Sequence, residues 1–175
     1  MIHVITGGSG SGKSEYAENW LTQEKDKNEI FVYIATMQPF GEETLKKIER
    51  HQKMRAEKGF QTIEKYVDLH SLEEMAHKSV LLECMSNLVA NEMYRKDLKS
   101  NTPEEIMKRV LDGVYHIAKE AKDFAIVTNE VGAELSDYSE ETREYIRILG
   151  EINQELSRKA DRVTEVVYGI PVKVK

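Results

Sequence analysis

A run of glycines near the start of the chain ends in a lysine and a serine, a combination suited to binding phosphate. The run matches the pattern G-x-x-x-x-G-K-[ST] at every position: Gly7, Gly8, Ser9, Gly10, Ser11, Gly12, Lys13 and Ser14. Glycines let backbone N–H groups converge on an anion without side-chain clashes. The lysine ammonium at such a site reaches the β- and γ-phosphates of a nucleotide, and the hydroxyl binds its Mg²⁺. The run therefore predicts a loop that binds ATP or GTP with Mg²⁺, and the full match disfavours a flexible glycine linker.

The loop stands between two elements that would position it. Residues 2–6 are apolar and predict a strand, and residues 13–22 predict a helix whose positive N-terminal end faces the phosphates. We expect Lys13 to lie in an exposed loop and to act as a phosphate ligand. This order of strand, loop and helix is typical of P-loop nucleotide-binding proteins.

Nucleotide-bound Mg²⁺ also needs an acid, which often stands at the end of a neighbouring strand. The apolar run 79–83 ends in Glu83, which we interpret as this acid, although Asp is the commoner residue there. A strand-terminal glutamate that faces solvent is the alternative. Cys84 follows directly, and we interpret it as a small packed residue and not as a nucleophile. It is the only cysteine, so no intrachain disulfide can form.

Strands and helices alternate along the rest of the chain, which predicts an α/β fold with a mostly parallel, P-loop NTPase-type sheet flanked by helices. A capping box that begins at Thr102 marks the start of one helix, and Ser139 marks another. The last two strands flank Gly169, which predicts an antiparallel C-terminal edge strand. The other elements are expected at residues 30–35, 62–64, 79–83, 124–128, 163–168 and 171–174 (strands) and 42–58 and 71–77 (helices).

Length and charge limit the classes of protein that fit. The 175 residues suit a single domain, 1–175. A net charge of -6 argues against a general nucleic-acid binder, which usually has a basic face. The apolar runs are far shorter than the ~20 residues of a membrane span, and the N-terminus lacks the pattern of a signal peptide. We therefore expect a cytoplasmic protein with no membrane span and no nucleic-acid partner.

With these features placed, the chain resembles the bifunctional adenosylcobinamide kinase / adenosylcobinamide-phosphate guanylyltransferase family of cobalamin biosynthesis. The likeness covers nearly the whole length of the chain. The phosphate loop alone is shared by many families, so the resemblance depends on the ordered combination. Besides the loop it rests on residues 33–36, 47–51, 81–84, 127–132, 152–154 and 169–173.

The resemblance implies two reactions at ATP and GTP. The first phosphorylates the aminopropanol hydroxyl of adenosylcobinamide at the phosphate loop, with Lys13 as a catalytic residue. The second transfers GMP from GTP, through a covalent histidine intermediate, to give adenosylcobinamide-GDP and pyrophosphate. The histidine that matches is His51, which is substantially neutral near physiological pH and can attack phosphorus. From the residues alone, His51 could instead be a boundary histidine that covers the apolar Leu45 and Ile48.

The resemblance also implies a homotrimer and a set of nucleotide contacts. Glu64 would accept hydrogen bonds from guanine or ribose, and Phe60 could stack on a base. Ala56 and Phe60 stand where the family usually has proline and tryptophan, which leaves the register of this segment open. The nucleotide contacts outside the phosphate loop are Thr36, Met37, Gln38, Gln52, Lys53, Met54, Arg55, Glu64 and Glu83.

Two other functions fit the same residues. One is a P-loop kinase that phosphorylates a different small molecule in a single reaction, with His51 purely structural. The other is a nucleotide-dependent switch without chemistry on a small substrate. GTP labelled at the α-phosphate separates the three: a covalent label indicates the two-reaction enzyme, turnover without label the kinase, and binding without turnover the switch.

Overall fold

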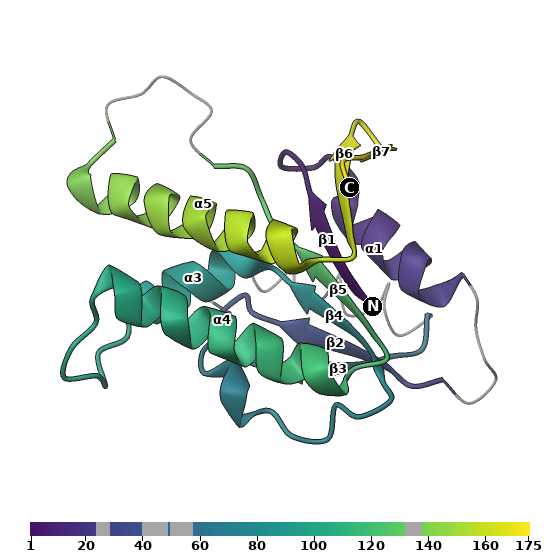
Figure 1. Cartoon of the computed structure of the whole chain (residues 1–175), viewed down its shortest axis with the longest axis horizontal. Helices are drawn as coiled ribbons and strands as arrows, with labels where there is room; N and C mark the ends of the chain where they lie inside the picture. The colour runs from purple at the N-terminus through teal and green to yellow at the C-terminus, as the bar shows by residue number, and fades with distance from the viewer. Residues whose placement is uncertain (24–28, 40–48, 50–57, 132–137) are drawn as a thin grey trace.

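The structure, a computed structural model, describes residues 1–23, 29–39, 49, 58–131 and 138–175. Within these ranges seven strands form one sheet in the order β3-β2-β4-β5-β1-β6-β7 (Figure 1). The strands are β1 Ile2–Thr6, β2 Phe31–Ala35, β3 Phe60–Glu64, β4 Ser79–Glu83, β5 Asp123–Val127, β6 Arg162–Val167 and β7 Ile170–Lys173. The helices are α1 Lys13–Thr22, α3 Met85–Met93, α4 Pro103–Glu120, α5 Glu140–Lys159 and the short 3₁₀ helix η1 Leu69–Ser71.

The sheet is parallel except at one edge. Strands β1 to β6 pair in parallel, and only β7 runs antiparallel to its neighbour β6. This arrangement confirms the predicted fold class, including the C-terminal edge strand. In a parallel sheet all carboxyl ends lie along one edge, which is where ligands bind in open α/β folds. The glycine-rich loop follows β1 at that edge.

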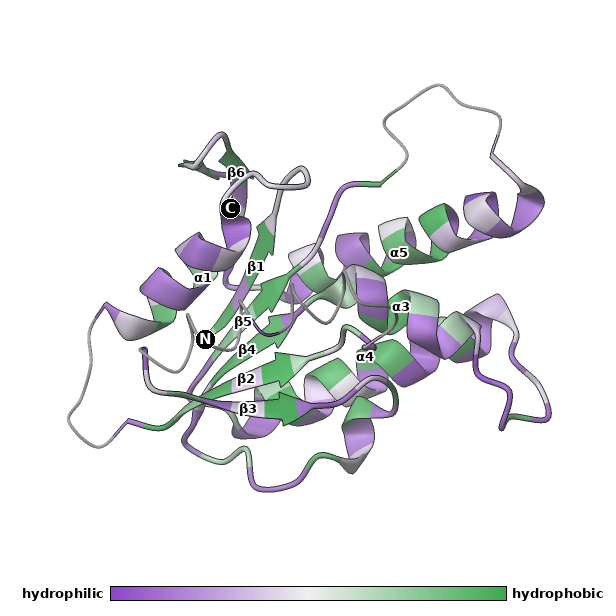
Figure 2. Cartoon of the chain, turned by 180° about the vertical axis from the view of Figure 1, so that it is seen from behind, coloured by the Kyte–Doolittle hydropathy of each residue, from purple (hydrophilic) through white to green (hydrophobic). Residues whose placement is uncertain are grey.

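Helices cover both faces of the sheet, with α1 on one side and α3, α4 and α5 on the other (Figure 1). Successive side chains of a strand point to opposite faces. Val4 accordingly belongs to the larger core cluster under α3, α4 and α5, whereas Ile5 belongs to the cluster under α1. Burial on both faces explains why the central strands β2, β4 and β5 are rich in consecutive apolar residues (Figure 2).

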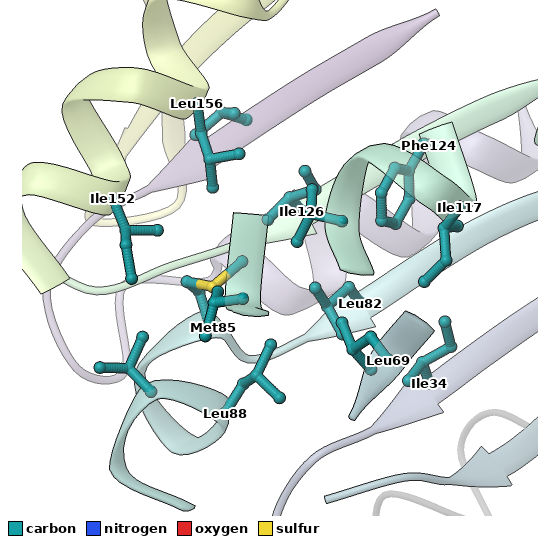
Figure 3. Close-up of a cluster of buried hydrophobic side chains, with 14 of the residues drawn as sticks. Ile34, Leu69, Leu82, Met85, Leu88, Ile117, Phe124, Ile126, Ile152 and Leu156 are labelled. Atoms are coloured by element: carbon teal, nitrogen blue, oxygen red, sulfur yellow. The ribbon is translucent and has the colours of Figure 1, made fainter. Parts of the chain in front are cut away.

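The larger cluster is made by the inner stripes of the long helices and the strands beneath them. Ile117 of α4 and Ile152 and Leu156 of α5 face Phe124 and Ile126 of β5 (Figure 3). Both helices begin at the predicted caps, because the Thr102 and Ser139 hydroxyls accept hydrogen bonds from backbone N–H groups three residues on. These caps satisfy donors that the first helical turn leaves unpaired.

One expected helix is not present among the described residues, and one helix that is present was not expected. The segment 71–77 is not a helix, since Glu74 and His77 have positive φ angles of 61° and 62° that no α-helix accommodates. Helix α3, in contrast, was not expected. Of the predicted helix 42–58, only Glu49 and Lys58 are among the described residues. Every helix within the described ranges is too short or too polar to cross a lipid bilayer.

Candidate functional site

The phosphate-binding loop joins a buried strand to the start of a helix, as predicted. β1 ends at Thr6, and α1 begins at Lys13. Gly12 caps the helix with a φ of 91°, a left-handed conformation that glycine adopts without strain. Gly7 leaves no room for a side chain, because a Cβ there would collide with the carbonyl oxygen of Val166 in β6. The loop is therefore held between α1 and the neighbouring strand.

Lys13 is buried, so the expectation that it lies in an exposed loop was wrong. Its relative exposure is 7%, because it is the first residue of α1 and folds back over the loop. Its Nζ donates a hydrogen bond of 2.8 Å to the carbonyl oxygen of Gly8. Burial lowers the pKa of the ammonium, and the nearby negative charge of Glu83 opposes that shift. The cation thus lies within the loop, close to the acid at the end of β4.

Ser14 and Glu83 meet although they stand 69 positions apart in the sequence. The Ser14 hydroxyl donates a hydrogen bond to Oε1 of Glu83. The second carboxylate oxygen, Oε2, is buried and has no hydrogen-bond partner within the described part of the chain. A buried carboxylate oxygen without a partner is costly unless a cation or donor joins it. Carboxylate and hydroxyl oxygens are ligands that Mg²⁺ accepts, so the pair fits the predicted metal.

Thr36 follows β2 and joins it to the end of β4. The side chain is completely buried, and its Oγ1 donates to the Cys84 carbonyl oxygen at 2.8 Å and accepts from the Cys84 N–H at 2.7 Å. Because these bonds occupy the hydroxyl, Thr36 fixes the strand ends that carry Glu83, and its side chain is not open to a nucleotide. Met37 and Gln38, the next two predicted contacts, are exposed.

A polar cluster surrounds the start of α3, and sequence reasoning missed Ser86, the residue at its centre. The buried Ser86 hydroxyl accepts a hydrogen bond of 2.7 Å from the Asn129 side-chain amide and lies 3.0 Å from the Cys84 sulfur. The Thr128 hydroxyl donates to Asn153 Oδ1 at 2.8 Å. Burial raises the pKa of the Cys84 thiol, which agrees with the interpretation of Cys84 as a packed residue and not a nucleophile.

The remaining predicted residues divide into two groups. His51, Gln52, Lys53, Met54 and Arg55 lie outside the described residues. Glu64 is exposed at the end of β3, where its Oε2 accepts a hydrogen bond of 2.7 Å from the Tyr66 hydroxyl. Burial and this carboxylate raise the pKa of Tyr66 to about 12.

Strand order separates Glu64 from the phosphate loop. Four strand-to-strand steps lie between β3 and β1, and at ~4.8 Å each they amount to roughly 19 Å. The contact of Glu64 with guanine or ribose stays a prediction, at this distance across the sheet from the phosphate loop.

Phe60 does not have the position that base stacking needs. Its relative exposure is 8%, and its ring packs against Phe31 and Tyr33 with centroid distances of 5.6 and 6.4 Å. The expectation that it stacks on a base is therefore corrected: Phe60 is part of the core under α1. Among the described residues, no group of three or more His, Cys, Asp or Glu side chains is arranged to hold a metal ion.

Solved structures with the same architecture include a nucleotide-hydrolysing domain. This ATPase domain matches with a TM-score of 0.53 at 12% identity, and the match covers 94% of this chain and 68% of the ATPase chain. The flagellar accessory protein FlaH from Methanocaldococcus jannaschii matches with a TM-score of 0.50 at 12% identity, and the match covers 99% of this chain and 77% of the FlaH chain. These likenesses support the fold.

Sequence comparison goes further. The bifunctional adenosylcobalamin biosynthesis protein CobU of Escherichia coli K12 is 31% identical over 189 residues, and that of Salmonella typhimurium LT2 is 32% identical over 187, each over the full length of both chains. The CobP protein of Pseudomonas aeruginosa is 27% identical over 183 residues, which cover 100% of this chain and 98% of its own. The sequence model of the CobU family, described as cobinamide kinase / cobinamide phosphate guanyltransferase, matches residues 3–174. The chain therefore belongs to the cobinamide kinase / cobinamide phosphate guanyltransferase family.

Proposed function

We propose that this chain phosphorylates adenosylcobinamide with ATP or GTP and then transfers GMP from GTP to the new phosphate. The observation that carries the proposal is a complete phosphate-binding loop, in which Lys13 folds back onto the Gly8 carbonyl and Ser14 bonds to Glu83 at the end of β4. It occurs in a chain that its family matches from residue 3 to residue 174. The products are adenosylcobinamide-GDP and pyrophosphate.

The first reaction takes place at the phosphate loop. The acceptor hydroxyl oxygen attacks the γ-phosphorus, the bond from that phosphorus to the β–γ bridging oxygen breaks, and ADP or GDP leaves while the hydroxyl proton passes to solvent. Lys13 and the N–H groups of the loop stabilise the charge on the phosphoryl oxygens, which is the main catalytic contribution in this chemistry. The buried position of Lys13 holds the cation in place beforehand and strengthens its field.

Ser14 and Glu83 would hold the Mg²⁺ that accompanies the nucleotide. When bound, the ion would neutralise charge on the phosphates of the nucleotide. Thr36 supports this arrangement as a positioning residue, because its hydroxyl bonds to both backbone groups of Cys84, the residue after Glu83. The carboxylate is thereby fixed at the sheet edge opposite the first turn of α1.

The second reaction uses His51 as the nucleophile. A ring nitrogen attacks the α-phosphorus of GTP, the bond to the α–β bridging oxygen breaks, and pyrophosphate leaves. A phosphate oxygen of adenosylcobinamide phosphate then attacks the same phosphorus, and the P–N bond breaks to free the histidine. The proposal rests on the resemblance of residues 47–51 to the family, within a family match that runs from residue 3 to residue 174. Two transfers through a covalent intermediate replace one difficult displacement.

The proposal includes a homotrimer in the cytoplasm. Support for association comes from the C-terminal hairpin, where four apolar side chains are well exposed: Tyr168 95%, Ile170 66%, Val172 45% and Val174 63%. Exposed apolar groups that lie together are typical of an interface. Light scattering coupled to size-exclusion chromatography measures the assembly directly, and a monomer would contradict this part of the proposal.

Product analysis tests the function. The purified chain is incubated with adenosylcobinamide, Mg²⁺ and ATP labelled at the γ-phosphate, and then with GTP labelled at the α-phosphate. We expect the first label, and afterwards the second, in the corrinoid fraction, with release of pyrophosphate in the second step. Nucleotide turnover without label in the corrinoid would contradict the proposal, and label from ATP alone would leave only the kinase.

A further inference from the structure

A hollow of about 450 Å³ lies between α5 and the strands β1 and β6, and at one end it reaches Thr6, the last residue of β1. Thr6, which directly precedes the loop, lines it, and so does Glu165, the residue that pairs with Thr6 across the two strands. The next residue of β6, Val166, is the one whose carbonyl oxygen abuts Gly7. One wall of the hollow is therefore the strand pair that supports the phosphate loop.

The lining of the hollow is rich in hydrogen-bonding groups. It includes the carboxylates of Glu130 and Glu165 and the side-chain amides of Asn153 and Gln154, with the Arg158 guanidinium at one side. Neither carboxylate forms a hydrogen bond or an ion pair with any part of the chain that the structure describes. Both carboxylates are therefore open to accept hydrogen bonds from a ligand that donates them.

These residues also account for two sequence segments that nucleotide chemistry leaves without a role. Residues 127–132 and 152–154 contribute to the likeness with the family, and neither segment contains a phosphate-loop or nucleophile residue. In the structure Glu130 and Asn153, which stand 23 positions apart in the sequence, line the same hollow. Thr128 links the two segments through its hydrogen bond to Asn153.

We propose that this hollow is the acceptor site, which binds the alcohol substrate through its carboxamide-bearing arms next to the phosphate loop. The inference rests on the proposed function, because a cobinamide carries a hydroxyl on an amide-linked arm and further carboxamides around its ring. Carboxylates accept hydrogen bonds from those N–H and O–H groups, and amides pair with amides. A pocket of this volume is within the usual range for small ligands, ~300–1,000 Å³, so it admits the arms while the corrin ring stays outside.

Valine side chains supply the apolar part of the lining. Val4 and Val163 form part of the lining between α5 and the sheet, and they offer apolar contact to the methylene groups of the arms. The polar groups would fix orientation, and the apolar ones would exclude water. Apolar side chains beside placed polar groups are a usual combination at small-molecule sites.

Equilibrium dialysis with adenosylcobinamide, followed by its visible absorbance, tests the site without requiring turnover. Ser157→Phe fills the hollow from α5, and Glu165→Gln removes one carboxylate charge while keeping its shape. Glu151→Gln is the matched control, since Glu151 is an exposed α5 residue that pairs with Arg147 outside the hollow. The dissociation constant of MgATP is measured on each variant in parallel.

We expect Ser157→Phe and Glu165→Gln to weaken adenosylcobinamide binding about tenfold or more, the size of effect for losing a hydrogen bond to a charged group. MgATP binding should stay within about twofold, and the control should match the wild type. Unchanged corrinoid binding in both hollow variants would overturn the inference. A wild-type chain that neither binds nor phosphorylates adenosylcobinamide would instead contradict the proposed function, so the two failures are distinguishable.

Discussion

The backbone N–H of Gly169 donates a hydrogen bond of 2.8 Å to the carbonyl oxygen of Ser11, which joins the tip of the C-terminal hairpin to the phosphate-binding loop. From the same side, the carbonyl of Val166 leaves no space for a side chain at Gly7. The tail of the chain therefore does more than close the sheet edge: it supports the loop that would bind the nucleotide.

The conformation of the hairpin gives the first prediction. Tyr168 and Gly169 both have positive φ, 49° and 80°, which is the pattern of a type I′ turn that favours Asn-Gly. We expect Tyr168→Asn to raise the free energy of unfolding by about 0.5–1 kcal/mol, because asparagine tolerates this conformation better than tyrosine. Gly169→Ala should lower it by about 1 kcal/mol and weaken nucleotide binding through Ser11. Urea unfolding and nucleotide titration measure both, and equal stability of the two variants would contradict the turn argument.

Replacement of Lys13 tests the phosphate loop. Lys13→Ala should reduce phosphorylation by at least about a hundredfold, since it removes the cation aimed at the transferring phosphoryl group. The variant should still fold, although the loss of this buried side chain will lower the free energy of unfolding more than the loss of an exposed one would. Lys13→Met keeps the aliphatic stem and should restore stability without activity. Normal kinase rates in either folded variant would remove the loop from the mechanism.

Glu83 gives a prediction about the metal. Glu83→Gln keeps the shape of the side chain and removes its negative charge, so we expect a fall in turnover of about 10- to 100-fold, as is usual for groups that support a metal. Nucleotide binding should change far less. The Mg²⁺ concentration needed for half-maximal rate should rise, and Glu151→Gln, which is remote from the loop, serves as the control. If turnover and its Mg²⁺ dependence were unchanged, Glu83 would be only the end of a strand.

A buried histidine under α1 predicts how stability depends on pH. The His3 ring is completely buried, with its Nε2 2.8 Å from the Thr164 hydroxyl and its edge against Trp20. Burial, with a smaller effect from Arg162, lowers the pKa of His3 to about 4 from 6.5. Below pH 6.5 the histidine of the unfolded chain is protonated, whereas His3 of the folded chain stays neutral. The free energy of unfolding therefore falls as the pH drops toward 4.

The measurement compares wild type with His3→Gln, whose amide can still bond to Thr164 but does not titrate. Between pH 7 and pH 5 the wild type should lose about 2 kcal/mol more of its unfolding free energy than the variant. Urea titrations at the two pH values give the difference. Parallel losses in both proteins would show that His3 carries no such linkage.

Elements with local signals were predictable from the sequence. The predicted boundaries of β1, α1 and β4 agree with the structure. Helices α4 and α5 begin directly after their N-cap residues, Thr102 and Ser139. Helix α3 was missed because its signals are not local. The side chain of its N-cap, Cys84, makes no capping hydrogen bond, and its buried face carries the polar Ser86 and Glu92, which interrupt an apolar stripe.

Partners distant in sequence stabilise α3. The Glu92 carboxylate is 1% exposed and accepts hydrogen bonds from the Asp68 N–H at 2.6 Å and from Arg109 Nε at 3.1 Å. A buried carboxylate is tolerated only with such partners. No pattern within residues 85–93 indicates them.

In the candidate site, too, the sequence indicated residues but not the contacts they make. Ser14 and Glu83 were both predicted as metal ligands, yet only the fold brings them within one hydrogen bond. Thr36 was expected to contact a nucleotide, and its hydroxyl is instead bonded to the backbone of Cys84. Sequence identifies which chemical groups are present, whereas strand order and register decide which of them meet.

The two-reaction mechanism depends most on His51, and intact-protein mass spectrometry tests it most directly. Wild type and His51→Ala are each exposed to GTP and Mg²⁺, quenched without acid because a phosphoramidate bond is acid-labile, and weighed, while adenosylcobinamide phosphorylation is assayed in parallel. The mechanism predicts that the wild type gains the mass of one GMP, and that His51→Ala gains none yet still forms adenosylcobinamide phosphate. A GMP adduct on the His51→Ala protein, or none on an active wild type, would contradict it.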